Sequence, residues 1–313
     1  MGAPVLSRED VLAAQQRIRP FVRRTPLLAG GSGLNAALKC EFMQVTGVFK
    51  ARGAFNRQLA AQERGELDPT VGIAVASGGN AGLANSYAAQ RLGVPACVFV
   101  PENAPAVKVA LIREYGAEVR QVGAEYADAY LAAMDYVEDS GALFCHAYDQ
   151  LEVAAGAGVI AEEILADDPA IDSIVVAVGG GGLFAGVAAA VEGRAKVVAV
   201  EPTVIPTLRS ALERGEPVDV AVSGVAADSL GAKRIGRTAF ELAQRTSPVS
   251  VLVTDHEILQ TRTLLWRQFR IAVEAGAAAA YAALVTGAYQ PDEDERVAVV
   301  LCGANTDLST LTG

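Results

Sequence analysis

Cysteine is scarce in this sequence and is poorly placed for a shared structural role. The four cysteines, Cys40, Cys97, Cys145 and Cys302, lie far apart and form no C-x-x-C pair. Cysteines spaced in this way do not suggest a zinc site or a disulfide framework, and they are typical of proteins from a reducing compartment. We therefore expect a cytoplasmic protein.

Positive charge and long apolar runs are also missing. The 26 Lys and Arg residues are outnumbered by 36 Asp and Glu, for a net charge of -10, which argues against a nucleic-acid surface. No apolar stretch approaches the ~20 residues that span a bilayer. The longest candidate, 175–191, is interrupted by four consecutive glycines, and residues 1–10 do not resemble a signal peptide. We expect neither nucleic acid nor a membrane as a partner.

Short Val- and Ile-rich runs alternate with longer Ala-rich segments of helical period. The runs predict strands over 71–77, 96–101, 118–122, 142–146, 173–179, 195–201, 248–254 and 296–302. The segments between them predict helices over 82–92, 105–115, 125–139, 152–166, 183–191, 205–214 and 256–268, after an opening helix over 8–17 that Ser7 and Asp10 would cap. This alternation predicts an α/β fold with mostly parallel sheets.

Four consecutive glycines, Gly179, Gly180, Gly181 and Gly182, join a predicted strand directly to a predicted helix. Without side chains the backbone can wrap closely and direct several N–H groups at one anion, and a phosphate monoester suits such a loop. The spacing differs from the dinucleotide G-x-G-x-x-G motif and lacks the Lys of a nucleotide P-loop. The alternative is a tight turn, which needs fewer glycines.

A second strand-to-helix junction, Ser77-Gly78-Gly79-Asn80-Ala81-Gly82, combines a hydroxyl, an amide and exposed backbone N–H groups. These groups suit a carboxylate, which accepts several short hydrogen bonds at once. The same composition is common in turns that bind nothing.

Two further residues are candidates for chemistry. Lys50 stands beside Phe49 at a predicted helix start, where desolvation and the positive helix terminus would both lower its pKa, as a nucleophilic amine requires. Cys302 follows the last predicted strand. Taken singly, Lys50 could be a surface lysine and Cys302 an inert buried residue.

Together and in this order, these segments resemble the fold-type II pyridoxal-phosphate enzymes, and most closely the serine/threonine dehydratases. The family's lysine motif, S-F-K-x-R-G, is matched by residues 48–53, VFKARG, and the resemblance extends from about Thr25 to Asp307. Residues 39–44 look like the family's lead-in strand. The resemblance implies a tryptophan synthase β-like fold of two α/β lobes, a large one from 1–70 and 146–313 and a small one from 71–145, in an enzyme that is usually a homodimer.

The resemblance also implies a role for each motif. Lys50 and Ser77 would be the catalytic residues, with Lys50 forming the Schiff base to pyridoxal 5'-phosphate. The cofactor would contact Lys50, Phe49, Asn80, Gly179, Gly180, Gly181, Gly182, Leu183, Ala226 and Cys302, with Cys302 at the pyridine nitrogen. The substrate carboxylate would be bound by Ser77, Gly78, Gly79, Asn80 and Ala81.

The implied activity is that of a lyase, which converts L-threonine or L-serine to a 2-oxo acid and ammonia by β-elimination. The alternatives are β-replacement, racemisation or another elimination on a small, possibly modified amino acid, and a catalytically weak binding relative. Two departures bear on this choice: Val48 replaces the motif's serine, and Gly78 stands where serine racemases carry a second serine. Glu201 matches a carboxylate of the family's frequent metal site, but no acid follows within 203–207, so we expect no metal. For His146 we expect structural hydrogen bonding.

Overall fold

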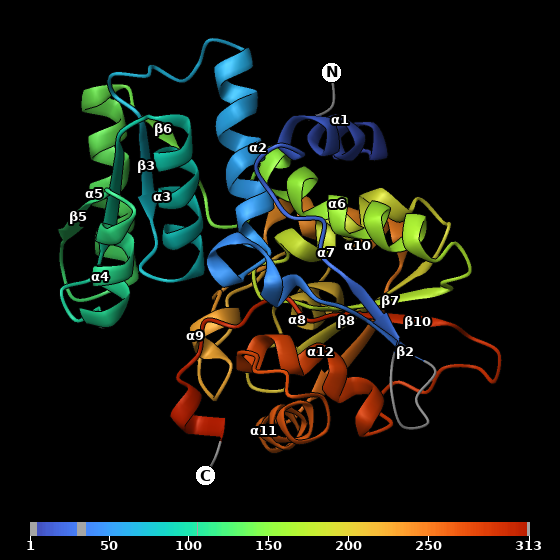
Figure 1. Cartoon of the computed structure of the whole chain (residues 1–313). Helices are drawn as coiled ribbons and strands as arrows, with labels where there is room; N and C mark the ends of the chain where they lie inside the picture. Colours follow the sequence, from blue (N-terminus) through green and yellow to red (C-terminus); the bar gives the residue numbers. More distant parts are fainter. Residues whose placement is uncertain (1–4, 30–35, 105, 312–313) are drawn as a thin grey trace.

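The computed structural model describes residues 5–29, 36–104 and 106–311, and its strands form two separate sheets (Figure 1). The larger sheet has six strands in the order β1-β2-β10-β7-β8-β9. Only β1 and β2 are antiparallel; the other neighbours are parallel. The strand bounds are β1 Leu27–Ala29, β2 Ala36–Lys39, β7 Ser173–Ala177, β8 Lys196–Pro202, β9 Val249–Val253 and β10 Val297–Val300.

The smaller sheet has four parallel strands in the order β5-β4-β3-β6. Its strands are β3 Ile73–Ala76, β4 Ala96–Val100, β5 Glu118–Gln121 and β6 Leu143–Phe144. Helices α3 (Asn80–Leu92), α4 (Ala106–Glu114) and α5 (Tyr126–Ser140) connect them and lie around this sheet. Each of the eight strands predicted from the Val- and Ile-rich runs is therefore present, and the fold class is confirmed.

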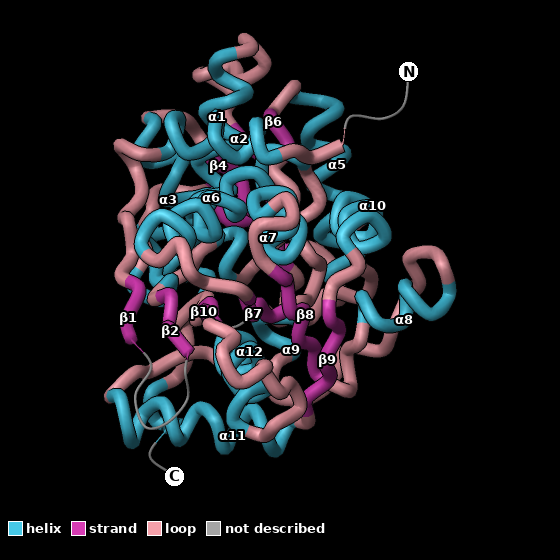
Figure 2. Tube along the Cα trace, turned by 90° about the vertical axis from the view of Figure 1, so that its right-hand side faces the viewer, coloured by secondary structure: helices cyan, strands magenta, loops and turns pink. Residues whose placement is uncertain are grey.

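Helices cover both faces of the larger sheet (Figure 2). One face carries α1 (Arg8–Ile18), α6 (Leu151–Asp167), α7 (Gly182–Val191) and α10 (Arg237–Thr246), and the other carries α11 (Asp255–Leu264) and α12 (Ala275–Val285). The short helices are α8 (Thr207–Arg214) and α9 (Ala227–Leu230). Burial on both faces explains the apolar strands: every residue of β7 and β10 is buried.

Helix α2 (Lys50–Glu63) runs between the two groups of elements and carries Lys50 as its first residue (Figure 1). It lies unusually close to α6 because glycines face one another. A Cβ on Gly53 would come within 2.6 Å of the Val153 carbonyl oxygen, and one on Gly156 within 2.5 Å of the Arg52 oxygen. Side chains at either position would push α2 away, so these glycines fix where Lys50 stands.

Some sequence predictions differ from the structure. The lead-in strand over 39–44 is wrong: β2 ends at Lys39, and Glu41–Met43 and Val45–Gly47 are 3₁₀ turns. The chain turns there because the buried Glu41 carboxylate accepts hydrogen bonds from Arg52. The helix expected over 256–268 ends at Leu264 and continues as a π-helical turn, Leu265–Phe269.

Other predictions are confirmed. Ser7 and Asp10 form a reciprocal capping box on α1. Helices α3, α5, α6, α7 and α8 begin and end within a few residues of their predicted bounds. The helix predicted over 105–115 is α4, although residue 105 itself lies outside the described residues.

Within 5–29, 36–104 and 106–311, none of the helices has the length and apolar character needed to span a membrane.

Candidate active site

Lys50 begins α2 at the carboxyl end of the larger sheet. Its Nζ donates to the Ala147 carbonyl oxygen at 3.3 Å and lies 5.1 Å from the centre of the Phe49 ring. Burial lowers the pKa of Lys50, while Cys302 and Glu274 act in the opposite direction. A desolvated amine of this kind loses its proton more readily than a surface lysine, which favours nucleophilic chemistry.

The glycine loop lies between β7 and the first turn of α7. Gly181 has φ +89°, a conformation that favours glycine. A Cβ on Gly180 would come within 2.4 Å of the Tyr148 ring, so the loop has no room for a side chain there. Bare backbone N–H groups at a helix N-terminus form an anion site.

These two features line one cavity together with other residues predicted from the sequence. Its lining consists of Phe49, Lys50, Asn80, Tyr148, Ala177, Gly179, Gly180, Gly181, Gly182, Leu183, Ser229, Leu230, Glu274 and Cys302. An amine, a glycine loop, an amide and a thiol that are far apart in the sequence therefore meet around one space.

The second glycine-rich junction joins β3 to α3 beside this cavity. Asn80 is the first residue of α3, and Ser77 Oγ accepts a hydrogen bond from the Gly79 amide at 3.4 Å. Ser77, Gly78 and Gly79 are partly buried but do not line the cavity itself. Ala81 lines an adjoining cavity that also contains Lys50.

Cys302 and Ala226 differ in their relation to the cavity. Cys302 follows β10 and is buried, and burial raises the pKa of its thiol well above the usual value, so the group is neutral. Ala226 is also buried, directly before α9, but it is not part of the cavity lining.

Glu274 is a cavity residue that sequence reasoning missed. It is only 6% exposed, and its Oε2 accepts a hydrogen bond from Asn80 Nδ2 at 2.8 Å. Burial raises the pKa of Glu274 to about 7, although Asn80 and Lys50 partly oppose the shift. The available signal was a lone carboxylate within an apolar segment, residues 271–285.

His146 lies in the adjoining cavity as a structural residue, as predicted. Its Nδ1 accepts backbone hydrogen bonds from Asp149 at 2.9 Å and Tyr148 at 3.2 Å. Burial lowers the pKa of His146, Asp149 partly opposes this, and Lys50 lowers it further. A neutral imidazole that accepts at Nδ1 orders the turn behind Lys50.

Glu201 is the residue that matches a carboxylate of the family's frequent metal site. In this structure its carboxylate accepts hydrogen bonds from three groups of the protein. Its carboxylate accepts from the Leu208 amide at 2.7 Å, the Arg209 amide at 2.9 Å and Thr207 Oγ1 at 3.0 Å. These donors belong to the first turn of α8, so Glu201 caps that helix.

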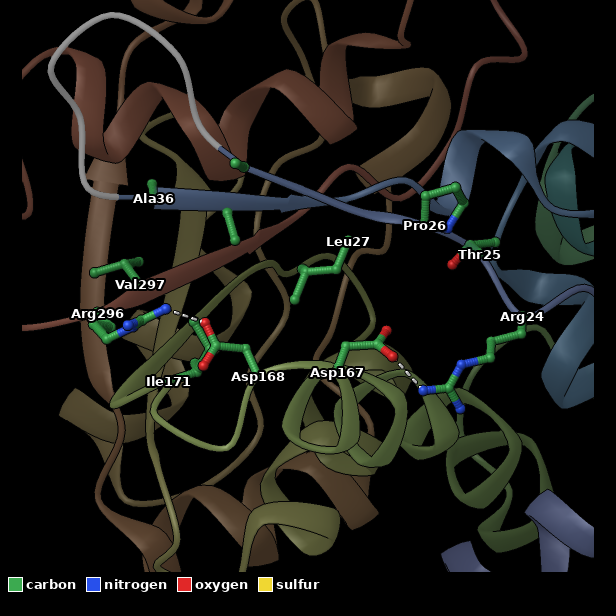
Figure 3. A pocket seen from close by; sticks show the side chains of 12 residues that line it. Arg24, Thr25, Pro26, Leu27, Ala36, Asp167, Asp168, Ile171, Arg296 and Val297 are labelled. Atoms are coloured by element: carbon green, nitrogen blue, oxygen red, sulfur yellow. Dashed lines mark hydrogen bonds and ion pairs between the residues drawn. The ribbon is translucent and has the colours of Figure 1, made fainter.

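A second hollow beside the amino ends of β2 and β10 contains more charge than the cavity does (Figure 3). Arg24 pairs there with Asp167, and Arg296 pairs with Asp168. Each of these two arginines is therefore neutralised by an aspartate, and all four side chains are partly exposed to solvent. Among its described residues, this hollow therefore presents no free reactive group comparable to Lys50.

The fold and the cavity define a class of enzyme, because an α/β scaffold combines a desolvated lysine with a glycine loop at a helix N-terminus. The family described as "Pyridoxal-phosphate dependent enzyme" matches residues 18–303, and the chain belongs to that family.

The similarity to individual relatives covers almost the whole chain. It is 36% identical to the L-threonine ammonia-lyase of Geobacter sulfurreducens, over 96% of this chain and 75% of that protein. It is 35% identical to the phenylserine dehydratase of Ralstonia pickettii, over 96% of this chain and 93% of the other.

Solved structures agree with this assignment. The serine racemase of Dictyostelium discoideum superimposes with a TM-score of 0.88 at 32% identity, over 97% of this chain and 99% of that one. The threonine deaminase of T.th. gives a TM-score of 0.89 at 33% identity, over the same shares of the two chains.

The residues around the cavity fit the family's cofactor. The loop 179–182 excludes any side chain at Gly180 and ends at the α7 N-terminus, as a phosphate site requires. Lys50 supplies an amine in the same cavity, and the neutral Cys302 thiol lies in its lining. Gly179–Gly182 and Leu183 would hold the phosphate, and Lys50 would carry the aldehyde carbon.

Proposed function

We propose that this enzyme is a dehydratase of small β-hydroxy amino acids, which converts L-threonine or L-serine to a 2-oxo acid and ammonia. The observation that carries the proposal is the meeting of Lys50, Asn80, Cys302 and the glycine loop around one cavity. The proposal is supported by the names of similar proteins, among them an L-threonine ammonia-lyase and a phenylserine dehydratase.

Each residue contributes a distinct part of the chemistry. Bound pyridoxal phosphate withdraws electrons from the substrate's Cα and so weakens its C–H bond. Lys50 would accept that proton, and burial, which lowers its pKa, favours the free amine that this role needs. Phe49, which lines the cavity, would pack beside the cofactor ring, and Cys302 would face the ring nitrogen as a neutral thiol. A neutral partner there would limit charge build-up on the ring and favour prompt departure of the β-hydroxyl.

The junction between β3 and α3 is the substrate's carboxylate site in this proposal. Ser77 Oγ and the backbone N–H groups of 78–81 stand at the α3 N-terminus, where a negative charge is stabilised. Ala226 remains a prediction for the second face of the cofactor ring.

The predicted lobes, 1–70 with 146–313 and 71–145, remain a proposal that the two sheets support. All strands of the smaller sheet lie within 73–144. We infer that the lobe 71–145 closes over the substrate and excludes water before elimination.

Racemisation is the strongest competitor, because a serine racemase is among the similar structures. The serine found in racemases at the second position of the loop is Gly78 here. A Cβ at Gly78 would lie 3.2 Å from Val100 Cγ1, which is a tight contact. Without a hydroxyl at this position, the loop lacks the group that would return a proton to the opposite face of Cα.

The proposal also includes the oligomeric state of the enzyme and its place in the cell. We infer a homodimer in the cytoplasm, as the family resemblance implies, and four buried free cysteines agree with a reducing compartment.

The decisive experiment offers L- and D-serine, L- and D-threonine and L-phenylserine to the cofactor-loaded protein. We expect a 2-oxo acid, measured by coupled reduction, and an equal amount of ammonia from an L-β-hydroxy amino acid. Lys50→Ala should form neither. Accumulation of the D-amino acid without ammonia would establish racemisation instead, and no turnover of any compound would favour a binding relative.

A further inference from the structure

The side chain of Asn80 is bonded at both ends by residues from distant parts of the chain. Its Nδ2 donates to Glu274 Oε2 at 2.8 Å, and its Oδ1 accepts from Asn305 Nδ2 at 2.8 Å. Asn80 begins α3 beside the smaller sheet, whereas Glu274 precedes α12 and Asn305 follows β10. The three residues form a continuous chain of hydrogen bonds at the rim of the cavity.

One end of this chain is fixed by a backbone carbonyl. Asn305 Nδ2 also donates to the Thr46 carbonyl oxygen at 3.0 Å. A carbonyl oxygen can only accept, so the amide of Asn305 must present its NH₂ group on this side. Thr46 is held at φ +64°, an unfavourable conformation for a threonine, and the Ala304 amide bonds the Gly47 oxygen at 2.9 Å. The strained turn thus fixes the Thr46 carbonyl oxygen, and this oxygen in turn fixes the orientation of the Asn305 amide.

The other end is fixed by a carboxylate. Glu274 is buried, and its backbone amide donates to the Gly303 carbonyl oxygen at 3.1 Å, next to Cys302. The Asn305 donor holds Asn80 Oδ1 on its own side, so Asn80 directs Nδ2 toward Glu274, whose carboxyl oxygen accepts. A flipped amide would put two donors together at the bond to Asn305.

We propose that Glu274 and Asn305 are positioning residues that hold Asn80 with an amide N–H facing the cavity. Among the described residues, the bonds above use one of the two hydrogens of Asn80 Nδ2 and leave the other for a bound molecule. This rests on the proposed function, in which Asn80 lines the cofactor cavity, and it assigns the remaining hydrogen to the hydroxyl oxygen on the cofactor ring. The chain of bonds sets the direction of that donor before the cofactor arrives.

The charges around Glu274 connect this chain to Lys50. Lys50 and Lys108 favour the ionised carboxylate, whereas Asp228 and burial favour the neutral acid. Glu274 in turn acts on the thiol of Cys302 and on the amine of Lys50. A change in the charge of Glu274 therefore alters the field at the amine that carries the cofactor, and the bound cofactor's absorbance should report it.

The test compares isosteric variants by cofactor dissociation constant and by absorbance of the bound cofactor across pH. Asn305→Asp keeps the shape of Asn305 but cannot donate, so Asn80 should turn its oxygen to the cavity. We expect the dissociation constant for pyridoxal phosphate to rise roughly tenfold or more, because one hydrogen bond to the cofactor is lost. Glu274→Gln should also move the pH midpoint of the absorbance change.

The double variant Asn305→Asp with Glu274→Gln separates positioning from stability. The amide introduced at position 274 can donate to the flipped Asn80 oxygen, and the carboxylate introduced at position 305 can accept from its nitrogen. The bonds to Asn80 therefore re-form in the reverse direction. We expect the unfolding temperature to recover above that of Asn305→Asp while cofactor binding stays weak. Recovery of binding together with stability would overturn the proposal, since a purely structural link has no required direction.

Glu295→Gln is the matched control. Glu295 is a buried carboxylate before β10, at the end of the strand away from Cys302, and accepts from Lys196 Nζ at 2.8 Å. It should lose stability without a change in the cofactor spectrum. An unchanged spectrum and dissociation constant in both Asn305→Asp and Glu274→Gln would refute the positioning role. That result would leave the proposed function intact, because the product assay and Lys50→Ala test it separately.

Discussion

Lys50 and Arg52 are two residues apart in the same motif, yet their surroundings are opposite. Arg52 is fully buried and pairs with two carboxylates: Glu41 at 2.8 Å through two nitrogens, and Glu163 at 2.8 and 2.9 Å. Lys39 adds a further bond to Glu163 at 2.6 Å. Lys50 donates to a carbonyl oxygen at 3.3 Å. The paired cation supports the fold, and the weakly bonded one is available for chemistry.

The difference has a physical origin. A buried charge is tolerated only when partners replace the water it has lost, and Arg52 has a complete set. Lys50 has no such set among the residues that the structure describes, so burial lowers its pKa. A motif that carries both cations therefore combines an anchor for α2 with a desolvated amine at its first turn.

Removing the amine should give the largest effect on activity. We expect Lys50→Ala to lose roughly 10⁴-fold or more in kcat/KM, because both the cofactor link and the proton acceptor disappear. The unfolding midpoint should change little, since only a weak hydrogen bond of Lys50 is lost. Steady-state rates with a thermal melt check both statements. A large loss of stability with activity retained would contradict this prediction, because Lys50 would then support the fold as Arg52 does.

Breaking the anchor should have the opposite outcome. Arg52→Met leaves Glu41 and Glu163 buried with only part of their partners and should cost about 3–5 kcal/mol in the free energy of unfolding. Denaturant titration of the cofactor-free protein measures this. Arg237→Met, which removes an exposed pair with Glu241, serves as the control and should leave the midpoint unchanged. Equal losses in the two variants would show that the buried pairs are not the anchor.

Glu274 should make stability depend on pH. Its folded pKa of about 7 lies above the ordinary value of 4.5, so the folded protein retains a proton that the unfolded chain releases. Stability from this group is complete below about pH 4.5 and falls as the pH rises through 7, by up to about 3 kcal/mol. In Glu274→Gln this fall should vanish from unfolding curves of the cofactor-free protein. A slope identical to that of the wild type would assign it to another group.

The smallest effect should come from the glycine loop. Gly180→Ala places a methyl group where the Tyr148 ring stands, so either the ring or the loop must move. We expect the affinity for pyridoxal phosphate to fall about tenfold through displaced N–H donors, while stability changes little. Inorganic phosphate should compete with the cofactor less strongly in the variant. Unchanged competition would place the phosphate elsewhere.

The sequence predicts best what depends on local pattern. Strands such as β7 and β10 are apolar throughout because both faces are covered, and the glycine loop and the lysine motif are contiguous. Helix α12 was not predicted because it is buried on all sides and has no polar face to give a helical period. The strand over 39–44 was implied by the family resemblance alone, and the tertiary pair between Glu41 and Arg52 lies where the chain turns instead.

Glu274 and Asn305 were not predicted as site residues, because no local sequence pattern marks either of them. Glu274 acts through Asn80, which is 194 residues away, and Asn305 acts through the same residue from 225 positions away. Only the tertiary fold brings the first residue of α3 beside residues 274 and 305. Ala226 shows the converse, because a matching motif position does not by itself place a residue in the cavity.

The central claim is that Lys50, and no other lysine, carries the cofactor. Borohydride reduction of the loaded protein fixes pyridoxal phosphate to its amine, and peptide mass mapping then finds the labelled residue. We expect the label on the peptide that contains Lys50. A label on Lys39, Lys108, Lys196 or Lys233, or no label on any peptide, would contradict it.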